Sequence, residues 1–440
     1  MRFYILSLGC PKNTVESEGM RELLRAAGHS PSLTSDEADL LIVNTCAFID
    51  VAREESLEAL TQLAESKRPD QRLIAAGCMP ELLGQRLPDM VPSLDGLIST
   101  RRWREIPRLA EVLSTAPPGS RPHRLPDPAP PRSLVHPLPR SCPGMASAYV
   151  KIAEGCDAPC AFCTIPQIKG PFLSKPQQGI LTEVGELLEQ GVKEIILIAQ
   201  DTTAYGVDWG QKDVLASLIE DILEFAPTLA WLRIMYAYVQ RVTPRLIQTM
   251  AEREPVLHYL DLPLQHSHPA VLRRMNRPHD MARVRSIIGR LRAAMPDIAL
   301  RTSFIVGYPG ETKEEFRTLL DFMEEMAFDR VGVFVYSPEQ GTEAAELPDH
   351  VPQEIKLERY RQAMELQQDI SFEKNRQFLG SELRVLVEGT GEGISVGRSY
   401  RDAPEVDGLV IVDSELPVNE FAPVQITGAL EYDLMGQVKR

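Results

Sequence analysis

The chain lacks any apolar run of the roughly 18 residues that a membrane-spanning helix requires. Its first ten residues, MRFYILSLGC, hold an apolar stretch too short for a secretory signal and typical of a buried strand. We therefore expect a cytoplasmic protein without a membrane partner, in a compartment where thiols stay reduced. Apart from one proline-rich run, the sequence also lacks low-complexity tracts.

Positive charge is scarce, since 47 Lys and Arg stand against 62 Asp and Glu and give a formal net charge of −15. Binding to nucleic acid relies on clustered basic side chains, so direct contact with nucleic acid is not expected. An acidic surface instead suits a basic protein partner, or simply keeps the chain soluble. The length of 440 residues predicts about three domains.

Disulfides are not expected, because the seven cysteines are an odd number in a chain predicted to stay reduced. Metal binding or catalysis explains them better. The cysteines are Cys10, Cys46, Cys78, Cys142, Cys156, Cys160 and Cys163. Cys142 lies apart from the others, and we interpret it as a spare thiol without a role.

A proline-rich run divides the chain, since residues 116–143 contain ten prolines, which neither a helix nor a central strand accepts. Residues 117–146 are therefore predicted to be an extended linker. In residues 1–116, strand-like runs near 2–8, 40–44, 72–76 and 94–99 alternate with helical patterns. This alternation is typical of a doubly wound parallel sheet with helices on both faces.

After the linker, residues 147–370 repeat the alternation, with six strand-like runs starting near 148, 194, 232, 258, 301 and 330. Six strand–helix units predict a partial (βα)6 barrel, because a full barrel needs more chain. In residues 371–440, short alternating runs punctuated by glycine and proline predict a small all-β barrel. The predicted class is α/β with this small β module at the carboxyl end.

The strongest local signal is Cys156-Asp-Ala-Pro-Cys160-Ala-Phe-Cys163, which follows a predicted strand. Structural zinc needs a fourth ligand at a similar spacing, and the next histidine is His258. A cubane 4Fe-4S cluster normally takes four cysteines, so three leave one iron open. An open iron indicates chemistry rather than electron storage, and a zinc loop with one distant ligand is the alternative.

A second signal is spread over the first domain. Cys10, Cys46 and Cys78 each fall just past the carboxyl end of a predicted parallel strand, where open α/β sheets hold their ligands. The three thiols are predicted to meet there as a second site with an open position. The alternative is that each cysteine is simply a small buried side chain.

Together these features resemble the radical S-adenosylmethionine enzymes, and within them the methylthiotransferases, which join an N-terminal cluster domain, a radical core and a TRAM domain. The resemblance covers essentially the whole chain. The motif sequences are most similar to those of the branch that modifies small-subunit ribosomal protein twelve. The matching stretches are 7–14 (SLGCPKNT), 44–49 (NTCAFI), 76–79 (AGCM), 151–156 (KIAEGC), 198–203 (IAQDTT), 261–266 (DLPLQH), 301–312 (RTSFIVGYPGET), 328–334 (FDRVGVF) and 399–405 (SYRDAPE). The sequence departs from the family at Pro171 and Leu173, which replace basic residues, and at Tyr238-Val239-Gln240, where Tyr-Pro is usual.

The resemblance implies two 4Fe-4S clusters, one on Cys156, Cys160 and Cys163 that binds S-adenosylmethionine, and one on Cys10, Cys46 and Cys78 that holds or donates sulfur. It implies a transferase that adds a methylthio group to the β carbon of an aspartate in the ribosomal protein. A second S-adenosylmethionine supplies the methyl group, and a reductant such as a flavodoxin supplies electrons. The acidic terminal module is expected to meet the basic substrate through Glu405 and Asp407.

The resemblance also implies a set of residues around S-adenosylmethionine. Phe162 would shield the cluster, and glycines after the strand 301–306 would let the backbone approach the adenosine. Arg301 could pair with a carboxylate, although ordinary packing and strand-end hydrogen bonds are the alternative reading for these residues. The set is Phe162, Gln200, Asp201, Gln265, Arg301, Gly307 and Gly310.

Two other functions stay open. A tRNA methylthiotransferase would share the fold and both clusters, but it should carry a basic terminal module, and residues 371–440 have a net charge of about −5. A non-catalytic iron–sulfur electron carrier would have no use for open irons, and binding of S-adenosylmethionine would separate it from an enzyme.

Overall fold

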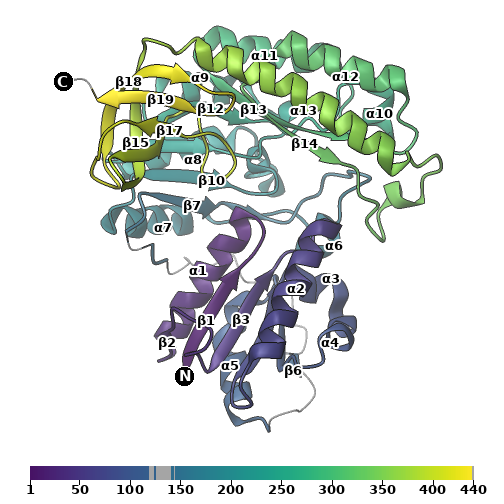
Figure 1. Ribbon diagram of the computed structural model, residues 1–440, viewed down its shortest axis with the longest axis vertical. Coiled ribbons are helices and arrows are strands. Elements are labelled where there is room, and N and C mark those ends of the chain that lie inside the picture. The colour runs from purple at the N-terminus through teal and green to yellow at the C-terminus, as the bar shows by residue number, and fades with distance from the viewer. Residues whose placement is uncertain (118–122, 125–139, 143, 439–440) are drawn as a thin grey trace.

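The computed structural model describes residues 1–117, 123–124, 140–142 and 144–438, which form three bodies (Figure 1). The N-terminal sheet lies below a larger α/β body, and a small β-barrel lies at one end of that body. Within the described chain, no helix has the length and apolar character needed to cross a membrane.

The first body is a parallel sheet of six strands in the order β2-β1-β3-β4-β5-β6. Its strands are β1 Arg2–Ser7, β2 Ser30–Pro31, β3 Leu40–Thr45, β4 Arg72–Gly77, β5 Gly96–Ser99 and β6 His123–Arg124. Its helices are α1 Pro11–Ala26, α2 Asp50–Ser66, α3 Cys78–Leu83, α4 Leu87–Met90 and α5 Ile106–Thr115. Along β3, Leu40 and Ile42 pack with α1 and α5, whereas Leu41 and Val43 pack with α2, α3 and α4. Helices on both faces confirm the predicted doubly wound sheet.

The second body is an open row of six parallel strands in the order β14-β13-β12-β11-β10-β7. The strands are β7 Ser147–Lys151, β10 Glu194–Ile198, β11 Trp231–Ile234, β12 Val256–Asp261, β13 Ala299–Val306 and β14 Arg330–Val335. The helices are α6 Ile165–Lys169, α7 Gln177–Glu189, α8 Val214–Phe225, α9 Pro244–Glu252, α10 Pro269–Arg274, α11 Met281–Ala294, α12 Lys313–Met326 and α13 Gln353–Arg376. The sequence order of the strands matches their spatial order, as the partial (βα)6 barrel requires.

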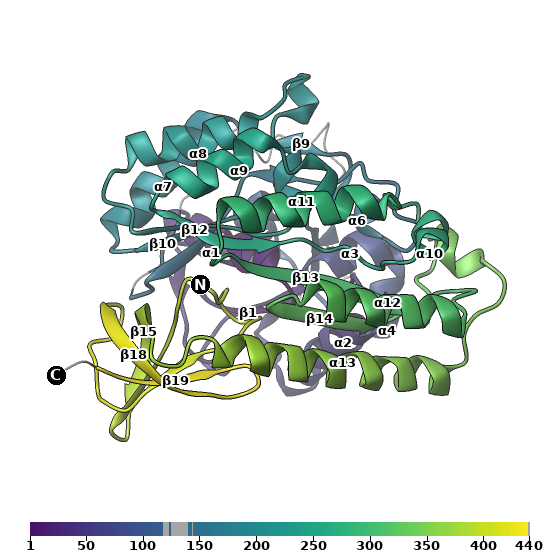
Figure 2. The ribbon, with the colours of Figure 1, turned by 90° about the horizontal axis from the view of Figure 1, so that it is seen from above.

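The third body is a closed barrel in the order β15-β16-β17-β19-β18. Its strands are β15 Glu382–Gly391, β16 Ile394–Arg398, β17 Val410–Val412, β18 Phe421–Ala429 and β19 Leu434–Val438. Figure 2 shows α13 running beside β14 and leading into this barrel. The predicted boundary at residue 370 falls inside α13, because one helix belongs to the second body and carries the third.

Buried ion pairs join the third body to the amino ends of the central strands. Glu194, the first residue of β10, binds Arg233 at 2.7 Å and Arg398 of the small barrel at 2.6 Å. Arg330, the first residue of β14, binds Asp402 at 2.6 Å. The carboxyl ends of the strands stay free for a site, as in barrel enzymes.

The predicted linker lies mostly outside the described residues. Its described parts are not simply extended: β6 pairs with β5 in parallel, and the guanidinium of Arg140 is buried between Glu18 and Glu183. Cys142 is only 1% exposed and packs in the core of the second body. Such short edge strands and long-range ion pairs leave no periodic signal in the sequence.

Candidate functional site

Cys10, Cys46 and Cys78 lie at the carboxyl ends of neighbouring strands. Cys10 precedes α1, Cys46 follows β3 and Cys78 is the first residue of α3. The backbone before Cys10 passes close to Cys46, since a Cβ added to Gly9 would lie 2.6 Å from the Cβ and 2.9 Å from the Sγ of Cys46. Gly9 has a φ of +89°, which glycine alone adopts without strain. The parallel sheet thus places the three cysteines at the same carboxyl edge, and their meeting in one site stays a prediction.

Two asparagines that the sequence reasoning missed hold this edge together. The amide of Asn13 donates to the carbonyls of Leu8 at 2.8 Å and Thr45 at 3.0 Å, so it ties the strand end before Cys10 to the one before Cys46. The amide of Asn44 donates to the carbonyl of Asn13 at 2.9 Å. Both lie in the quoted motifs SLGCPKNT and NTCAFI, but only the fold shows that they bridge neighbouring loops.

Cys156, Cys160 and Cys163 lie in the loop that ends at α6. The backbone N–H of Ala158 donates to the Sγ of Cys156 at 3.4 Å, and Arg277 donates to the Sγ of Cys160 at 3.7 Å. Donors aimed at sulfur stabilise thiolates, the ligand form that iron–sulfur clusters take. Arg277 is a further residue that the sequence reasoning missed, because it lies far from the motif in sequence.

Burial raises the pKa of several of these thiols. The pKa values of Cys46 and Cys78 are raised chiefly by burial, and the ammonium group of Lys169 opposes the rise for both. Burial also raises the pKa values of Cys156 and Cys163. Binding of a metal centre at either edge must therefore displace protons from the thiols.

The spacing of these thiols does not suit a single ion. Among the described residues, no three His, Cys, Asp or Glu side chains are grouped closely enough to share one metal ion. A 4Fe-4S cluster makes a different demand, because each cysteine binds its own iron atom. A structural zinc site requires four ligands on one ion. The three cysteines at each edge, with hydrogen-bond donors to sulfur, therefore fit a 4Fe-4S cluster better.

The two cysteine edges face one another across the domain boundary. The ammonium of Lys12, two residues after Cys10, lies 3.1 Å from the ring centroid of Tyr236, just past β11. Further along α1, the buried carboxylate of Glu16 binds Lys151 of β7 at 3.0 Å and Lys169 of α6 at 2.7 Å. The helix that begins at one cysteine set is thus anchored to the helix that follows the other.

The segment that departs from the family pattern packs directly under the second cysteine loop. The strands β8 Ala153–Glu154 and β9 Leu173–Ser174 pair antiparallel, and the N–H of Cys156 donates to the carbonyl of Gly170 at 3.1 Å. A Cβ on Gly155 would lie 2.1 Å from the carbonyl oxygen of Pro171. These contacts use backbone atoms, so Pro171 and Leu173 leave the support of the loop intact.

Several residues expected around S-adenosylmethionine lie near the carboxyl ends of the central strands. The side-chain oxygen of Gln200, just after β10, is buried and has no partner among the described residues, so it is open to a ligand donor. Asp201 instead accepts from Thr203 at 2.6 Å and pairs with Arg241 at 2.5 Å. Burial raises its pKa despite these contacts. Phe162 is half-buried and packs against the central core.

The other expected residues have identifiable structural roles. Gln265 has a φ of +74° and bridges to β13 through backbone bonds. Gly307, at φ +72°, is needed because a Cβ there would lie 2.3 Å from the Cγ of Lys356. A Cβ added to Gly310, at φ +69°, would make an ordinary contact with Arg274 at 3.7 Å. Close packing against α13 therefore explains Gly307, whereas the left-handed backbone explains Gly310.

Arg301 is committed to two carboxylates of this chain. It binds Asp261 at 3.0 Å and Asp407 of the small barrel at 3.3 Å. The Asp407 side chain is 1% exposed, so it cannot meet a partner surface, and only the exposed Glu405 of the expected pair remains available. Arg301 and Asp407 thus join two bodies of the chain.

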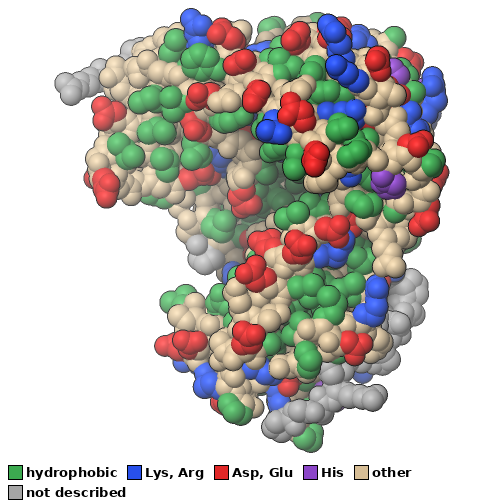
Figure 3. Space-filling view, turned by 45° about the vertical axis from the view of Figure 1, so that its right-hand side comes forward, with side chains coloured by type: hydrophobic (Ala, Val, Ile, Leu, Met, Phe, Trp, Pro, Cys, Tyr) green, Lys and Arg blue, Asp and Glu red, His purple; other side chains and the backbone are tan. Residues whose placement is uncertain are grey.

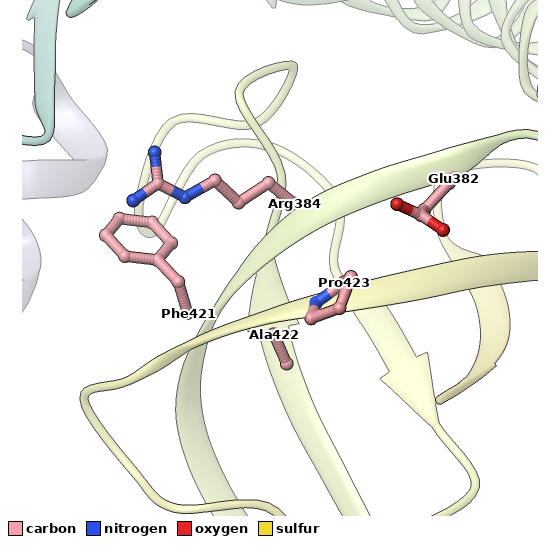
Figure 4. Close-up of a pocket in the computed structure, with 5 residues that line it drawn as sticks. All are labelled: Glu382, Arg384, Phe421, Ala422 and Pro423. Atoms are coloured by element: carbon pink, nitrogen blue, oxygen red, sulfur yellow. The ribbon is translucent and has the colours of Figure 1, made fainter. Parts of the chain in front are cut away.

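A surface pocket on the small barrel lies apart from the cysteines. Figure 4 shows its lining by Glu382, Arg384, Phe421, Ala422 and Pro423. The Arg384 guanidinium lies 3.8 Å from the Phe421 ring centroid. No thiol lines this pocket, so it is separate from the candidate site.

Comparison with known proteins agrees with this architecture. Residues 2–99 match an uncharacterized protein family, UPF0004, residues 150–323 match the radical SAM superfamily, and residues 379–438 match the TRAM domain. Among solved structures, the radical S-adenosylmethionine methyltransferase TsrM from Kitasatospora setae has a TM-score of 0.58 at 12% identity, covering 90% of this chain and 76% of that one. That likeness concerns the fold alone.

Curated relatives match over the full length. The ribosomal protein uS12 methylthiotransferase RimO of Roseiflexus sp. (strain RS-1) is 48% identical, covering 100% of this chain and 97% of that protein. The RimO of Herpetosiphon aurantiacus is 47% identical, covering 100% of both. With the radical SAM core and both cysteine edges in place, the chain belongs to the RimO family of methylthiotransferases.

Proposed function

We propose that this protein is a radical S-adenosylmethionine methylthiotransferase that modifies the β carbon of an aspartate in ribosomal protein uS12. The observation that carries the proposal is the pair of three-cysteine edges facing one another across the Lys12–Tyr236 and Glu16–Lys169 contacts. The names of the relatives support uS12 as the substrate. Action on a ribosomal protein would place the enzyme in the cytoplasm.

The residues present assign a role to each edge. Cys156, Cys160 and Cys163 would hold a 4Fe-4S cluster with an open iron, and Cys10, Cys46 and Cys78 would hold a second. When bound with S-adenosylmethionine, the first cluster supplies the electron and the radical that takes hydrogen from an unactivated carbon. The open oxygen of Gln200 and the backbone at Gly310 would serve the cofactor. Phe162, Asp201 and Gln265 would support that site, and a flavodoxin-type protein would supply electrons.

The shape and charge of the molecule suit a basic protein substrate. Figure 3 shows a recess between the N-terminal body and the upper bodies, with acidic side chains gathered along its edges. The net charge of −15 favours encounter with a basic protein rather than with the phosphates of tRNA.

The test of the function is mass spectrometry of uS12 and of bulk tRNA from cells with and without this gene. Loss of a methylthio mass from uS12 is the expected result. Loss of a methylthio adenosine from tRNA, with uS12 unchanged, would retain the chemistry and overturn the substrate.

Two clusters predict the iron content of the protein. After anaerobic reconstitution, replacing Cys156, Cys160 and Cys163 together with alanine should remove about four irons per chain, and replacing Cys10, Cys46 and Cys78 should remove the other four or so. Iron and sulfide assays with absorption spectra measure this. Cys142→Ala is the matched control, because Cys142 is buried in the core and should keep both clusters. Full iron content in either triple variant would contradict the assignment of that edge.

A further inference from the structure

Lys12 is a buried lysine that forms no ion pair with a carboxylate in the part of the chain that the structure describes. The residue is 7% exposed, and burial lowers its pKa to about 8, an effect that the nearby groups Cys10, Asp261 and Glu154 oppose. The buried lysines Lys151 and Lys169, in contrast, both bind Glu16. A buried charge without an ion pair is costly, so an anionic ligand that pairs with Lys12 would be stabilised there.

The ammonium is held in place without being neutralised. It lies 3.1 Å from the ring centroid of Tyr236, and a ring face attracts a cation while leaving its full charge available. Tyr236 itself is fixed, because its N–H donates to Asp261 at 3.2 Å and its φ is +61°. Asp261 forms an ion pair with Arg301 at 3.0 Å, and it acts on Lys12 only through its charge, which favours the ammonium form.

The position of Lys12 decides which anion it meets. It stands two residues after Cys10, and its ammonium reaches over the barrel mouth at Tyr236. A carbon that loses hydrogen at one edge and gains sulfur at the other must lie between the edges. We propose that Lys12 binds the side-chain carboxylate of the substrate aspartate and so fixes its β carbon, which is bonded directly to that carboxylate.

This inference rests on the proposed function and explains its selectivity. A carboxylate offers the ammonium a charge-assisted hydrogen bond, whereas a nucleobase offers no negative charge. Lys12 would therefore be a specificity-determining residue that favours an acidic side chain over the adenosine of the alternative substrate.

The experiment compares binding of two uS12 fragments, one with the target aspartate and one with asparagine in its place. Fluorescence anisotropy with the full-length, reconstituted protein gives both affinities. The wild type should prefer the aspartate fragment by about 10- to 100-fold, the range of a lost charged hydrogen bond. Lys12→Met should reduce this preference to within about twofold, Lys12→Arg should retain part of it, and the exposed Lys313→Met should keep all of it.

The outcomes separate this inference from the function it rests on. An unchanged preference in Lys12→Met would overturn the role of Lys12, even if the wild type methylthiolates uS12. Loss of iron from the Lys12 variants would also overturn it, because Lys12 would then serve the cluster on Cys10. Where Lys12→Met does not fold, Lys12→Gln provides the same comparison. A wild type that modifies tRNA and ignores both fragments would instead refute the proposed function.

Discussion

Replacing Glu16 with glutamine should lower the free energy of unfolding by up to about 3–5 kcal/mol, because the buried ammonium groups of Lys151 and Lys169 then keep only one of their two shared carboxylates, Glu154. Glu16 binds Lys151 at 3.0 Å and Lys169 at 2.7 Å, and it accepts from the hydroxyl of Thr100 at 3.0 Å. Glu16, the two lysines and Thr100 are all buried, so water cannot replace the lost charge. Urea unfolding at neutral pH measures the change.

The control for this variant lies on the same helix. Glu22 pairs with Arg25 at 3.3 Å at the surface, and Glu22→Gln should change stability by less than about 1 kcal/mol. If both variants lost the same free energy of unfolding, the buried ion pairs of Glu16 would contribute no more to stability than a surface pair. Burial alone would raise the pKa of Glu16, but the two ammonium groups outweigh it and lower that pKa.

The pH dependence of this variant has a defined sign. A carboxyl whose pKa is lowered on folding contributes its stability above the ordinary glutamate pKa and loses it as the pH falls toward the lowered value. The difference between wild type and Glu16→Gln should therefore be full near pH 7 and shrink in acid. A difference that grows in acid would contradict the ion-pair assignment.

Replacing Glu194 with glutamine should have a similar effect at the other end of the barrel, about 3–5 kcal/mol. Its carboxylate binds Arg233 at 2.7 Å and Arg398 at 2.6 Å, and both Glu194 and Arg233 are fully buried. The loss leaves two guanidinium groups facing one another between the second and third bodies. Urea unfolding measures stability, and limited proteolysis after α13 reports whether the small barrel has detached.

A surface pair across the same boundary provides the comparison. Lys193 binds Glu420 at 2.5 Å, with the Glu420 side chain 61% exposed, and Glu420→Gln should cost less than about 1 kcal/mol.

The pKa of Glu194 is lowered to about 2, since the two arginines outweigh the opposing effect of burial. Its contribution should thus be intact above about pH 5 and be lost only as the pH falls toward 2. Loss of this contribution between pH 6 and 8 would contradict it.

A series of side-chain contacts runs from the small barrel to the N-terminal body. Asp407 of the small barrel binds Arg301, Arg301 binds Asp261, and Asp261 accepts from the N–H of Tyr236, over which Lys12 lies. These contacts give the small barrel a structural role, because its loop with Asp407 binds Arg301 of β13. Glu405 in the same loop stays exposed.

Local sequence patterns predicted the three bodies and the order of the main strands, and they singled out the two cysteine sets. Apolar periodicity indicates which face of each strand is buried. The short spacing from Cys156 to Cys163 keeps these thiols in one loop, independently of how the rest of the chain packs. Parallel strands share a carboxyl edge, so the placement of Cys10, Cys46 and Cys78 at that edge also followed from local pattern.

The contacts by which these bodies meet could not be predicted from local pattern. Arg277 beside Cys160, Lys12 over Tyr236 and Arg301 between Asp261 and Asp407 are contacts between residues far apart in sequence. Side-chain partners of this kind depend on how whole elements pack, and charged residues carry no periodic signal that reveals burial. For the same reason Asp407 looked like a surface acid in the sequence, while the fold buries it against Arg301.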